Sequence, residues 1–378
     1  LTLLGCGGQK AGTKEGDGDK QAQGPIKIGA IAAFSGNSAD MGVPMKQGIT
    51  LAIDEFNAQG GIGGRKIDVI FLDDEADPAK SVTQAKKLIE KDNVAAIISG
   101  PNSGTVKANV KVTSEAKVVN LISIGQNDDL VDPNDPWTFR VTEPNSYNID
   151  RIVKYVLKKG YKKAGILADT TAYGQSGTKA VKEKLTAAGI PVVATESHPV
   201  AATDLTAQAL NLKKAGVDVV YVFSLGPDAA LFTKTLKQIG WQVPLVGGRG
   251  LNLAAFVKLG GTAADGMVIP SVVDPNKPEF QKFKEKYEKQ YGTPASYMFA
   301  ALGYESGRVM IEALKKSGGE GGEKLRTAIE SIDNFPAVVG GPGAYFSYGP
   351  KKHEGYTGNF NVLMVIKDAQ YTLLEENS

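Results

Sequence analysis

The stretch IKIGAIAAFSGNSADMGVPMKQGITLAIDEFNAQGGIGGRKIDVIFLDD, residues 26–74, decides the fold. β-Branched residues are frequent in Ile26–Ala32 and Lys66–Asp73, which predicts two strands. Between them, apolar residues recur at helical spacing from about Val43 to Asn57, and the glycines of 60–64 end that helix. The order strand, helix, strand is typical of a βαβ unit, so the two strands should lie parallel in one sheet.

The same alternation continues along the chain. Asp77 and Pro78 start the next helix, with Asp77 as N-cap and Pro78 at the first helical position. A first series of elements ends near residue 123, and a second series runs from Tyr147 to Leu259. We therefore predict an α/β fold with two doubly wound parallel sheets, one in each of two lobes. The further predicted elements are strands 94–99, 118–123, 163–168, 191–196, 217–223 and 242–247, and helices 104–116, 147–159, 175–188, 205–215, 228–239 and 253–259.

The last third of the chain does not form a third sheet. Its predicted elements must be shared between the two lobes, and they are helices near 279–291, 300–317 and 324–331 and strands near 359–365 and 370–374. Gly and Pro gather at 270–278 and 340–349, where we expect the chain to cross between lobes, as it does at 143–145. Three crossings form a three-stranded hinge that suits closure around a ligand.

These crossings divide the chain into lobes. We expect the first lobe to contain residues 25–144 and 272–345, and the second to contain 145–271 and 346–378. A chain of 378 residues exceeds the usual size of one hydrophobic core, which agrees with two domains.

Composition excludes several classes of partner. Lys and Arg number 43 and Asp and Glu 41, so the net charge of +2 predicts no nucleic acid and no anionic membrane surface as partner. No apolar run approaches the roughly 20 residues that span a bilayer. With two histidines and one cysteine, we expect no metal, and no motif indicates a cofactor.

The cysteine lies near the N-terminus, at Cys6. Leu3-Leu4-Gly5-Cys6 is similar to the end of a bacterial lipoprotein signal peptide, in which the cysteine carries the lipid. Residues 7–24 are rich in Gly, Lys, Gln and Asp, as in a flexible tether. We expect residues 1–24 to be a signal remnant, lipidated cysteine and tether that hold the protein at a membrane, in the periplasm or on the outer cell surface.

The loops that follow the predicted strands should form the site. Open α/β sheets bind ligands beyond the carboxyl ends of their strands, where helix N-termini favour a carboxylate. These loops are rich in Gly, Ser, Asn and Thr, and comprise residues 34–42, 100–105, 124–127, 169–174, 224–228 and 248–252.

Six motifs in order make the chain resemble the type I periplasmic binding proteins of branched-chain amino acid ABC transporters. They are IAAFSG (31–36), NAQGGIGG (57–64), DDEADP (73–78), GPNSG (100–104), DTTAYG (169–174) and ALGYE (301–305). The resemblance implies a monomeric binding protein without cofactor. It captures a small amino acid or related acid by hinge closure and delivers it to a permease.

The resemblance also implies contacts for single residues. Ser103 matches a serine that binds the ligand carboxylate, Gly125 a backbone contact to the same headgroup, and Tyr173 a tyrosine that folds over the ligand. Met41 stands where a tyrosine often packs, while Ser224 and Phe299 are further candidates for the cleft.

Two positions depart from the family pattern. Gln126 replaces a Thr or Ser beside the headgroup, and Arg249 replaces the glutamate that pairs with an α-ammonium. A guanidinium repels an ammonium and suits a second carboxylate or other anion, so the ligand is expected to be a small acid that need not be a branched-chain amino acid.

Alternatives stay open for several of these residues. Ser103 could be a plain helix N-cap, and Arg249 could face solvent or pair with an acid at the lobe edge. Phe299, like Phe34 and Phe223, could belong to the core rather than the cleft.

An enzyme and a sensor are the rival functions. His198 and His353 stand far apart and are expected to be surface residues, and the acids of 73–77 are expected to form a turn and an N-cap. No nucleophile motif is present, so we expect no enzyme. A lipoprotein that presents its ligand to a membrane sensor is the alternative to a transport protein.

Overall fold

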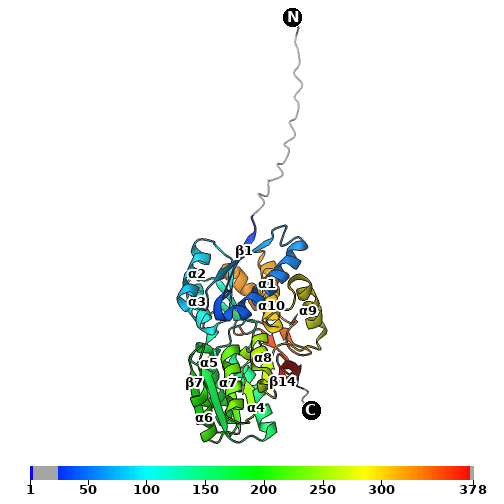
Figure 1. Cartoon of the computed structure of the whole chain (residues 1–378). Coiled ribbons are helices and arrows are strands. Elements are labelled where there is room, and N and C mark those ends of the chain that lie inside the picture. Colours follow the sequence, from blue (N-terminus) through cyan, green and yellow to red (C-terminus); the bar gives the residue numbers. More distant parts are fainter. Residues whose placement is uncertain (3–23, 375–378) are drawn as a thin grey trace.

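The computed structural model describes residues 1–2 and 24–374, which form two α/β lobes (Figure 1). The first lobe is built on a five-stranded sheet in the order β2-β1-β3-β4-β5, and its strands are parallel. Apolar side chains of β1, β3, β4 and β5 are buried, as the β-branched runs predict for the first three, whereas most of those on the edge strand β2 are half-buried. The strands are β1 (Ile26–Ala32), β2 (Ile67–Asp73), β3 (Ala96–Ser99), β4 (Val119–Ile122) and β5 (Thr138–Arg140).

Helices from both ends of the chain cover this sheet. They are α1 (Ala39–Ala58), α2 (Pro78–Glu90), α3 (Ser103–Glu115), α9 (Pro278–Tyr291), α10 (Tyr297–Ser317) and α11 (Gly322–Glu330). The Asp77 side chain accepts hydrogen bonds from Ala79 N and Lys80 N, which confirms the predicted cap of α2. α1 and α10 lie side by side (Figure 1), and a Cβ at Gly48 would lie 2.0 Å from the Ala300 carbonyl oxygen. Glycine therefore permits this close approach.

The second lobe contains a seven-stranded sheet in the order β15-β14-β10-β9-β8-β6-β7. β6 to β10 are parallel, and β14 and β15 add an antiparallel edge. Both predicted sheets are thus confirmed. The elements are β6 (Ala164–Asp169), β7 (Val192–His198), β8 (Val219–Phe223), β9 (Leu245–Gly247), β10 (Val268–Ser271), β14 (Val362–Lys367), β15 (Gln370–Leu373), α4 (Asn145–Lys159), α5 (Ala172–Ala187), α6 (Thr206–Lys214), α7 (Gly226–Gln238) and α8 (Ala254–Gly260).

The chain passes between the sheets after β5, after β10 and before β14. The third passage lies at residues 358–361, later than the predicted 340–349, because Arg140 of β5 still pairs with Glu354. Ahead of it, an unpredicted three-stranded sheet is formed by β11 (Phe335–Pro336), β12 (Tyr345–Phe346) and β13 (Tyr356–Thr357). β5 and β10 were also not predicted, because runs of three or four residues carry little periodicity.

The prediction of surface histidines is wrong. His198 is 1% exposed at the end of β7, and His353 is 6% exposed with its ring 4.3 Å from that of Phe139. Cys6 lies outside the described residues, so lipid attachment stays a prediction. Within the described part of the chain, no helix is long and apolar enough to cross a membrane.

Candidate functional site

A cavity of about 430 Å³ lies between the two lobes, at the carboxyl ends of the strands of both sheets. Doubly wound sheets bind ligands at this edge. The first lobe lines it with the loops after β1, β2, β3 and β4 and with Phe299 of α10. The second lobe adds the loops after β6, β8 and β9, including Tyr173, Leu225 and Arg249.

Ser103 stands at the centre of the first-lobe wall. It is the first residue of α3, and its N-cap is Asn102, so the interpretation of Ser103 as an N-cap is wrong. Ser103 Oγ accepts hydrogen bonds from the backbone N–H groups of Gln126 at 3.3 Å and Asn127 at 3.2 Å. Its own proton is thus available for a ligand oxygen, beside the first N–H groups of α3, which have no intrahelical acceptor.

Tyr173 stands on the second-lobe wall, in the first turn of α5. Its ring lies 5.8 Å from that of Phe223, and its hydroxyl accepts a hydrogen bond from Gly250 N at 3.1 Å. Burial raises the pKa of Tyr173 well above its usual range, so the hydroxyl stays protonated and can donate its proton to an oxygen in the cavity.

Arg249 lies beside Tyr173 and is 1% exposed. Its Nη2 donates to the Ile124 carbonyl at 3.0 Å, and its Nε lies 3.3 Å from Oε1 of Glu143, which is fully buried. Burial lowers the pKa of the Arg249 guanidinium, and the Glu143 carboxylate opposes that shift. Arg249 is thus both a cavity residue and half of a buried ion pair.

Sequence reasoning missed Glu143 as a partner of Arg249. It stands in the crossing between β5 and α4, where Thr142-Glu143-Pro144-Asn145 was read only as a hinge. Its Oε2 accepts from Thr142 Oγ1 at 2.9 Å, while Oε1 also accepts from Gln126 Nε2 at 3.4 Å. The feature that could have indicated Glu143 is an acidic residue in a crossing segment that leads into the cleft. Its partner, Arg249, lies far away in the sequence, so no local pattern joins the two.

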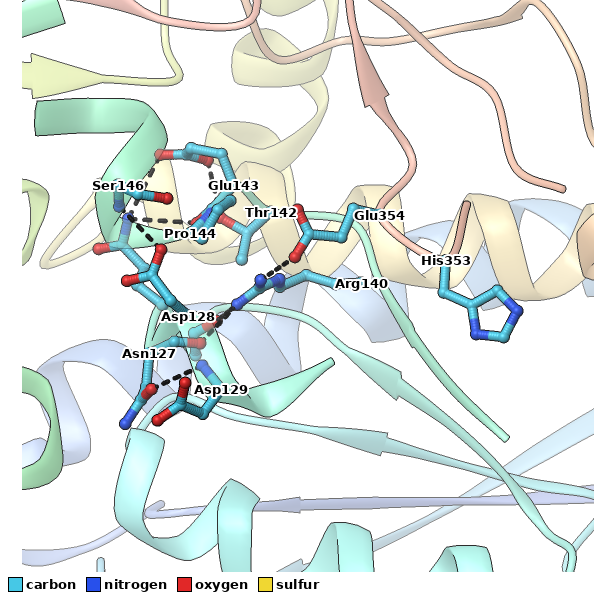
Figure 2. Close-up of polar contacts among 12 residues, drawn as sticks. Asn127, Asp128, Asp129, Arg140, Thr142, Glu143, Pro144, Ser146, His353 and Glu354 are labelled. Atoms are coloured by element: carbon cyan, nitrogen blue, oxygen red, sulfur yellow. Dashed lines mark hydrogen bonds and ion pairs between the residues drawn. The ribbon is translucent and has the colours of Figure 1, made fainter. Parts of the chain in front are cut away.

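Arg140 supports the loop that holds Gln126, and it too was missed. Its buried guanidinium donates to the carbonyl of Gly125 at 3.4 Å. It also donates to the Asn127 carbonyl at 2.9 Å and pairs with Glu354 (Figure 2). One cation thereby fixes the ligand-facing loop to the small sheet beside the hinge. The strand that carries Arg140, β5, was not predicted, which is why the residue was overlooked.

Hydrogen bonds also cross the cleft directly. Asp128 Oδ2 accepts from Ser176 Oγ of α5 at 3.0 Å. Asp128 Oδ1 accepts from Ser146 N of α4 at 3.1 Å (Figure 2). Asn127 Nδ2 donates to the Ala172 carbonyl at 3.4 Å. The loop after β4 therefore contacts both lobes in this state.

The remaining predicted site residues divide into two groups. Met41 and Phe299 line the cavity, with Ile124, Val200 and Leu225 as further apolar neighbours. Gly125 and Ser224 do not line it.

Their neighbours explain this outcome. A Cβ at Gly125 would lie 2.9 Å from Leu130 Cδ1, so a side chain there would meet the protein interior, while the backbone contact of Gly125 with a ligand stays a prediction. Ser224 is fully buried beside Leu225. Phe34 and Phe223 also lie outside the lining. Among the described residues, no group of His, Cys, Asp and Glu could hold a metal ion.

The family model described as periplasmic binding protein matches residues 25–368. The chain belongs to the periplasmic binding protein family. Its curated relatives include Leu/Ile/Val-binding protein homolog 2 of Brucella abortus, which is 29% identical over 83% of this chain and 85% of the relative. A Leu/Ile/Val-binding protein of Rhizobium johnstonii is 28% identical over 84% of this chain and 87% of the relative.

Solved structures share the fold. A type 1 periplasmic binding protein from Bordetella pertussis has a TM-score of 0.85 at 24% identity and covers 93% of this chain and 99% of its own. The branched-chain amino acid transporter substrate binding protein of Streptococcus pneumoniae, in complex with isoleucine, has a TM-score of 0.82 at 24% identity and covers 92% and 97%. The periplasmic binding protein type I fold is therefore confirmed.

Proposed function

We propose that this chain is an extracytoplasmic solute-binding protein of an ABC importer, which captures a small carboxylate-bearing ligand between its lobes and delivers it to a permease. The observation that carries the proposal is the cavity between the strand ends, with Ser103 and the N-terminus of α3 on one wall and Tyr173 and Arg249 on the other. Relatives named as Leu/Ile/Val-binding proteins, and a neighbour that binds isoleucine, support an amino acid or a related acid.

Closure follows from the contacts that each wall can make. The first wall offers the Ser103 hydroxyl and backbone N–H groups to a carboxylate. A bound ligand adds contacts to Tyr173 and Arg249 that exist only when the lobes approach, so it shifts the population toward the closed state. We further propose that the chain acts as a monomer without enzymatic activity, tethered through Cys6.

Mass spectrometry of the small molecule released from the purified protein tests the proposal. We expect a compound with at least one carboxyl group. Titration calorimetry with that compound should then give a roughly tenfold weaker affinity for Ser103→Ala, because a hydrogen bond to a charged group is worth about 1.5–3 kcal/mol. Ser331→Ala, at the exposed end of α11, is the matched control and should bind as the parent does. A released ligand without an acidic group would contradict the proposal.

A further inference from the structure

Arg249 has more donors than the protein uses. Its Nη2 donates to the Ile124 carbonyl, whereas its Nη1 and its Nε, which lies 3.3 Å from Glu143 Oε1, are both buried without a hydrogen-bond partner among the described residues. Buried polar groups of proteins almost always have a partner, and a guanidinium presents its donors in a fixed plane. Because Arg249 lines the cavity, an acceptor on a ligand that packs against it is the candidate partner for these donors.

The carboxylate beside Arg249 already has partners within the protein. Glu143 accepts hydrogen bonds from Thr142 and Gln126 and faces the guanidinium, and it is 0% exposed. It is therefore not available to a ligand ammonium without breaking the pair, which would leave Arg249 as an uncompensated buried charge.

Acids in the cavity wall offer no substitute. Of the residues that line the cavity, Glu75 carries the negative charge, and it forms an ion pair with Lys80 at 2.6 Å with about half of its side chain exposed. An α-ammonium held near Tyr173 would meet the Arg249 cation and no unpaired carboxylate among these residues. Like charges at such short range disfavour binding.

The other lining groups set the rest of the ligand. The Tyr173 hydroxyl can donate its proton, and Met41, Ile124, Val200, Leu225 and Phe299 present apolar surface. A cavity of about 430 Å³ lies within the range of small-molecule sites. The site thus offers donors to two polar groups and apolar contact to one side chain.

We infer that this site selects small apolar acids that carry an oxygen, as an α-oxo or α-hydroxy group, where an amino acid carries its α-ammonium. This inference rests on the proposed function, because it assumes that the first wall holds the carboxylate. The ligand oxygen accepts from Arg249 Nη1 and Tyr173 Oη, and the Arg249–Glu143 pair stays intact.

Three compounds of one skeleton test the inference by titration calorimetry on the full chain, after unfolding and refolding to remove any carried ligand. They are α-ketoisocaproate, isocaproate and leucine, which differ only at the α-carbon. We expect the oxo acid to bind roughly tenfold more tightly than isocaproate and roughly a hundredfold more tightly than leucine. Phenylpyruvate, hydrocinnamate and phenylalanine repeat the comparison with a larger side chain.

Two variants test whether the preference for oxo acids depends on the Arg249–Glu143 pair. Arg249→Gln should reduce the ratio of oxo acid to isocaproate affinity to about threefold or less, because the charged donor is lost. Arg308→Gln removes a comparable partner of a buried acid, Glu305, outside the cavity, and should leave the ratio unchanged. The comparison of ligands on the unmodified chain does not depend on either variant folding.

Outcomes separate the inference from the proposed function. Leucine or phenylalanine binding as tightly as the corresponding oxo acid would overturn the inference and leave carboxylate capture standing. Binding of none of the six acids, with a released ligand that has no carboxyl group, would overturn both.

Discussion

The two walls of the cleft use different chemistry to face the same ligand. The first wall holds the ligand with uncharged donors, the Ser103 hydroxyl and the N-terminus of α3 above the loop that carries Gln126, while its charged lining residue, Glu75, is paired with Lys80. The second wall carries a full positive charge on Arg249, which Glu143 balances from the crossing segment. Uncharged donors can hold any carboxylate, whereas a buried cation whose charge is already balanced can discriminate among ligands by their hydrogen-bonding groups. Under the proposed function, capture and selection belong to different lobes.

Among the predicted effects of mutation on the free energy of unfolding, we expect the loss of Glu143 to have the largest, because Glu143 balances the charge of the second wall. Glu143→Ala leaves the Arg249 guanidinium buried without its counter-charge, so the free energy of unfolding should fall by about 3–5 kcal/mol. Chemical denaturation measures this change. The double variant Glu143→Ala, Arg249→Met should recover much of the loss, because no isolated charge remains. Equal stability of the single and double variants would show that the pair does not couple these residues.

Arg140 fixes the ligand-facing loop of the first wall to the segment that carries Glu354, and its removal should have the next largest effect. Arg140→Met deprives the Gly125 and Asn127 carbonyls of their donor, so we expect a loss of about 2–3 kcal/mol in the free energy of unfolding. Ligand affinity should fall as well, because this loop carries Gln126. Glu354→Gln is the control, since its side chain reaches solvent and a neutral amide oxygen can still accept from Arg140. Similar losses in both variants would contradict the assigned role of the guanidinium.

Sequence patterns predicted most of the scaffold and less of the second wall. The apolar runs that begin with Ile26–Ala32 predicted most strands of both sheets, because buried strands and amphipathic helices differ in the spacing of their apolar residues. The resemblance indicated that Ser103, Tyr173 and Arg249 face one cleft, and the structure brings these residues together around the cavity.

Partners that depend on packing could not be read from the sequence. Glu143 meets Arg249 only because the crossing segment lies under the loop after β9, and no local pattern records that contact. His198 and His353 were misplaced for the same reason, because a lone histidine at a strand end or turn is buried or exposed according to what packs over it. Short strands such as β5 offered too few residues for a period.

A mutation in the first wall should reduce the affinity for every carboxylate ligand by a similar factor, whatever group the ligand carries at its α-carbon. Ser103→Ala removes one donor to the carboxylate, so we expect oxo acid, hydroxy acid and unsubstituted acid all to lose roughly tenfold in affinity, corresponding to about 1.4 kcal/mol. Tyr173→Phe should instead reduce affinity only for acids with an oxygen at the α-carbon. Calorimetry with the three ligands separates the two patterns. A Ser103→Ala effect confined to one ligand would place selection on the first wall.

A buried aspartate lies behind each wall. Mutating either one should have the smallest of the effects considered, a change in how stability depends on pH. Desolvation raises the pKa of Asp74 after β2 and of Asp169 at the end of β6, despite hydrogen bonds from Ala76 N and Thr171 N. The folded protein therefore holds these protons more tightly than the unfolded chain. Their contribution to stability is fully present below the unfolded pKa of about 3.9 and is lost as the pH rises through the folded value.

Asparagine at either position cannot ionise, which gives the test. Relative to the parent, the melting temperature of Asp74→Asn and of Asp169→Asn should rise between about pH 4 and pH 7. Asp204→Asn is the control of opposite sign, because hydrogen bonds from Thr206 lower the pKa of that exposed carboxyl and its stabilisation is lost as the pH falls. A parallel response of all three variants would mean that burial does not govern the two inner carboxyls. A response of Asp169→Asn alone would mean that burial destabilises the ionised carboxylate only behind the wall that carries Arg249. The two walls would then differ in the residues behind them as well as in the residues that face the ligand.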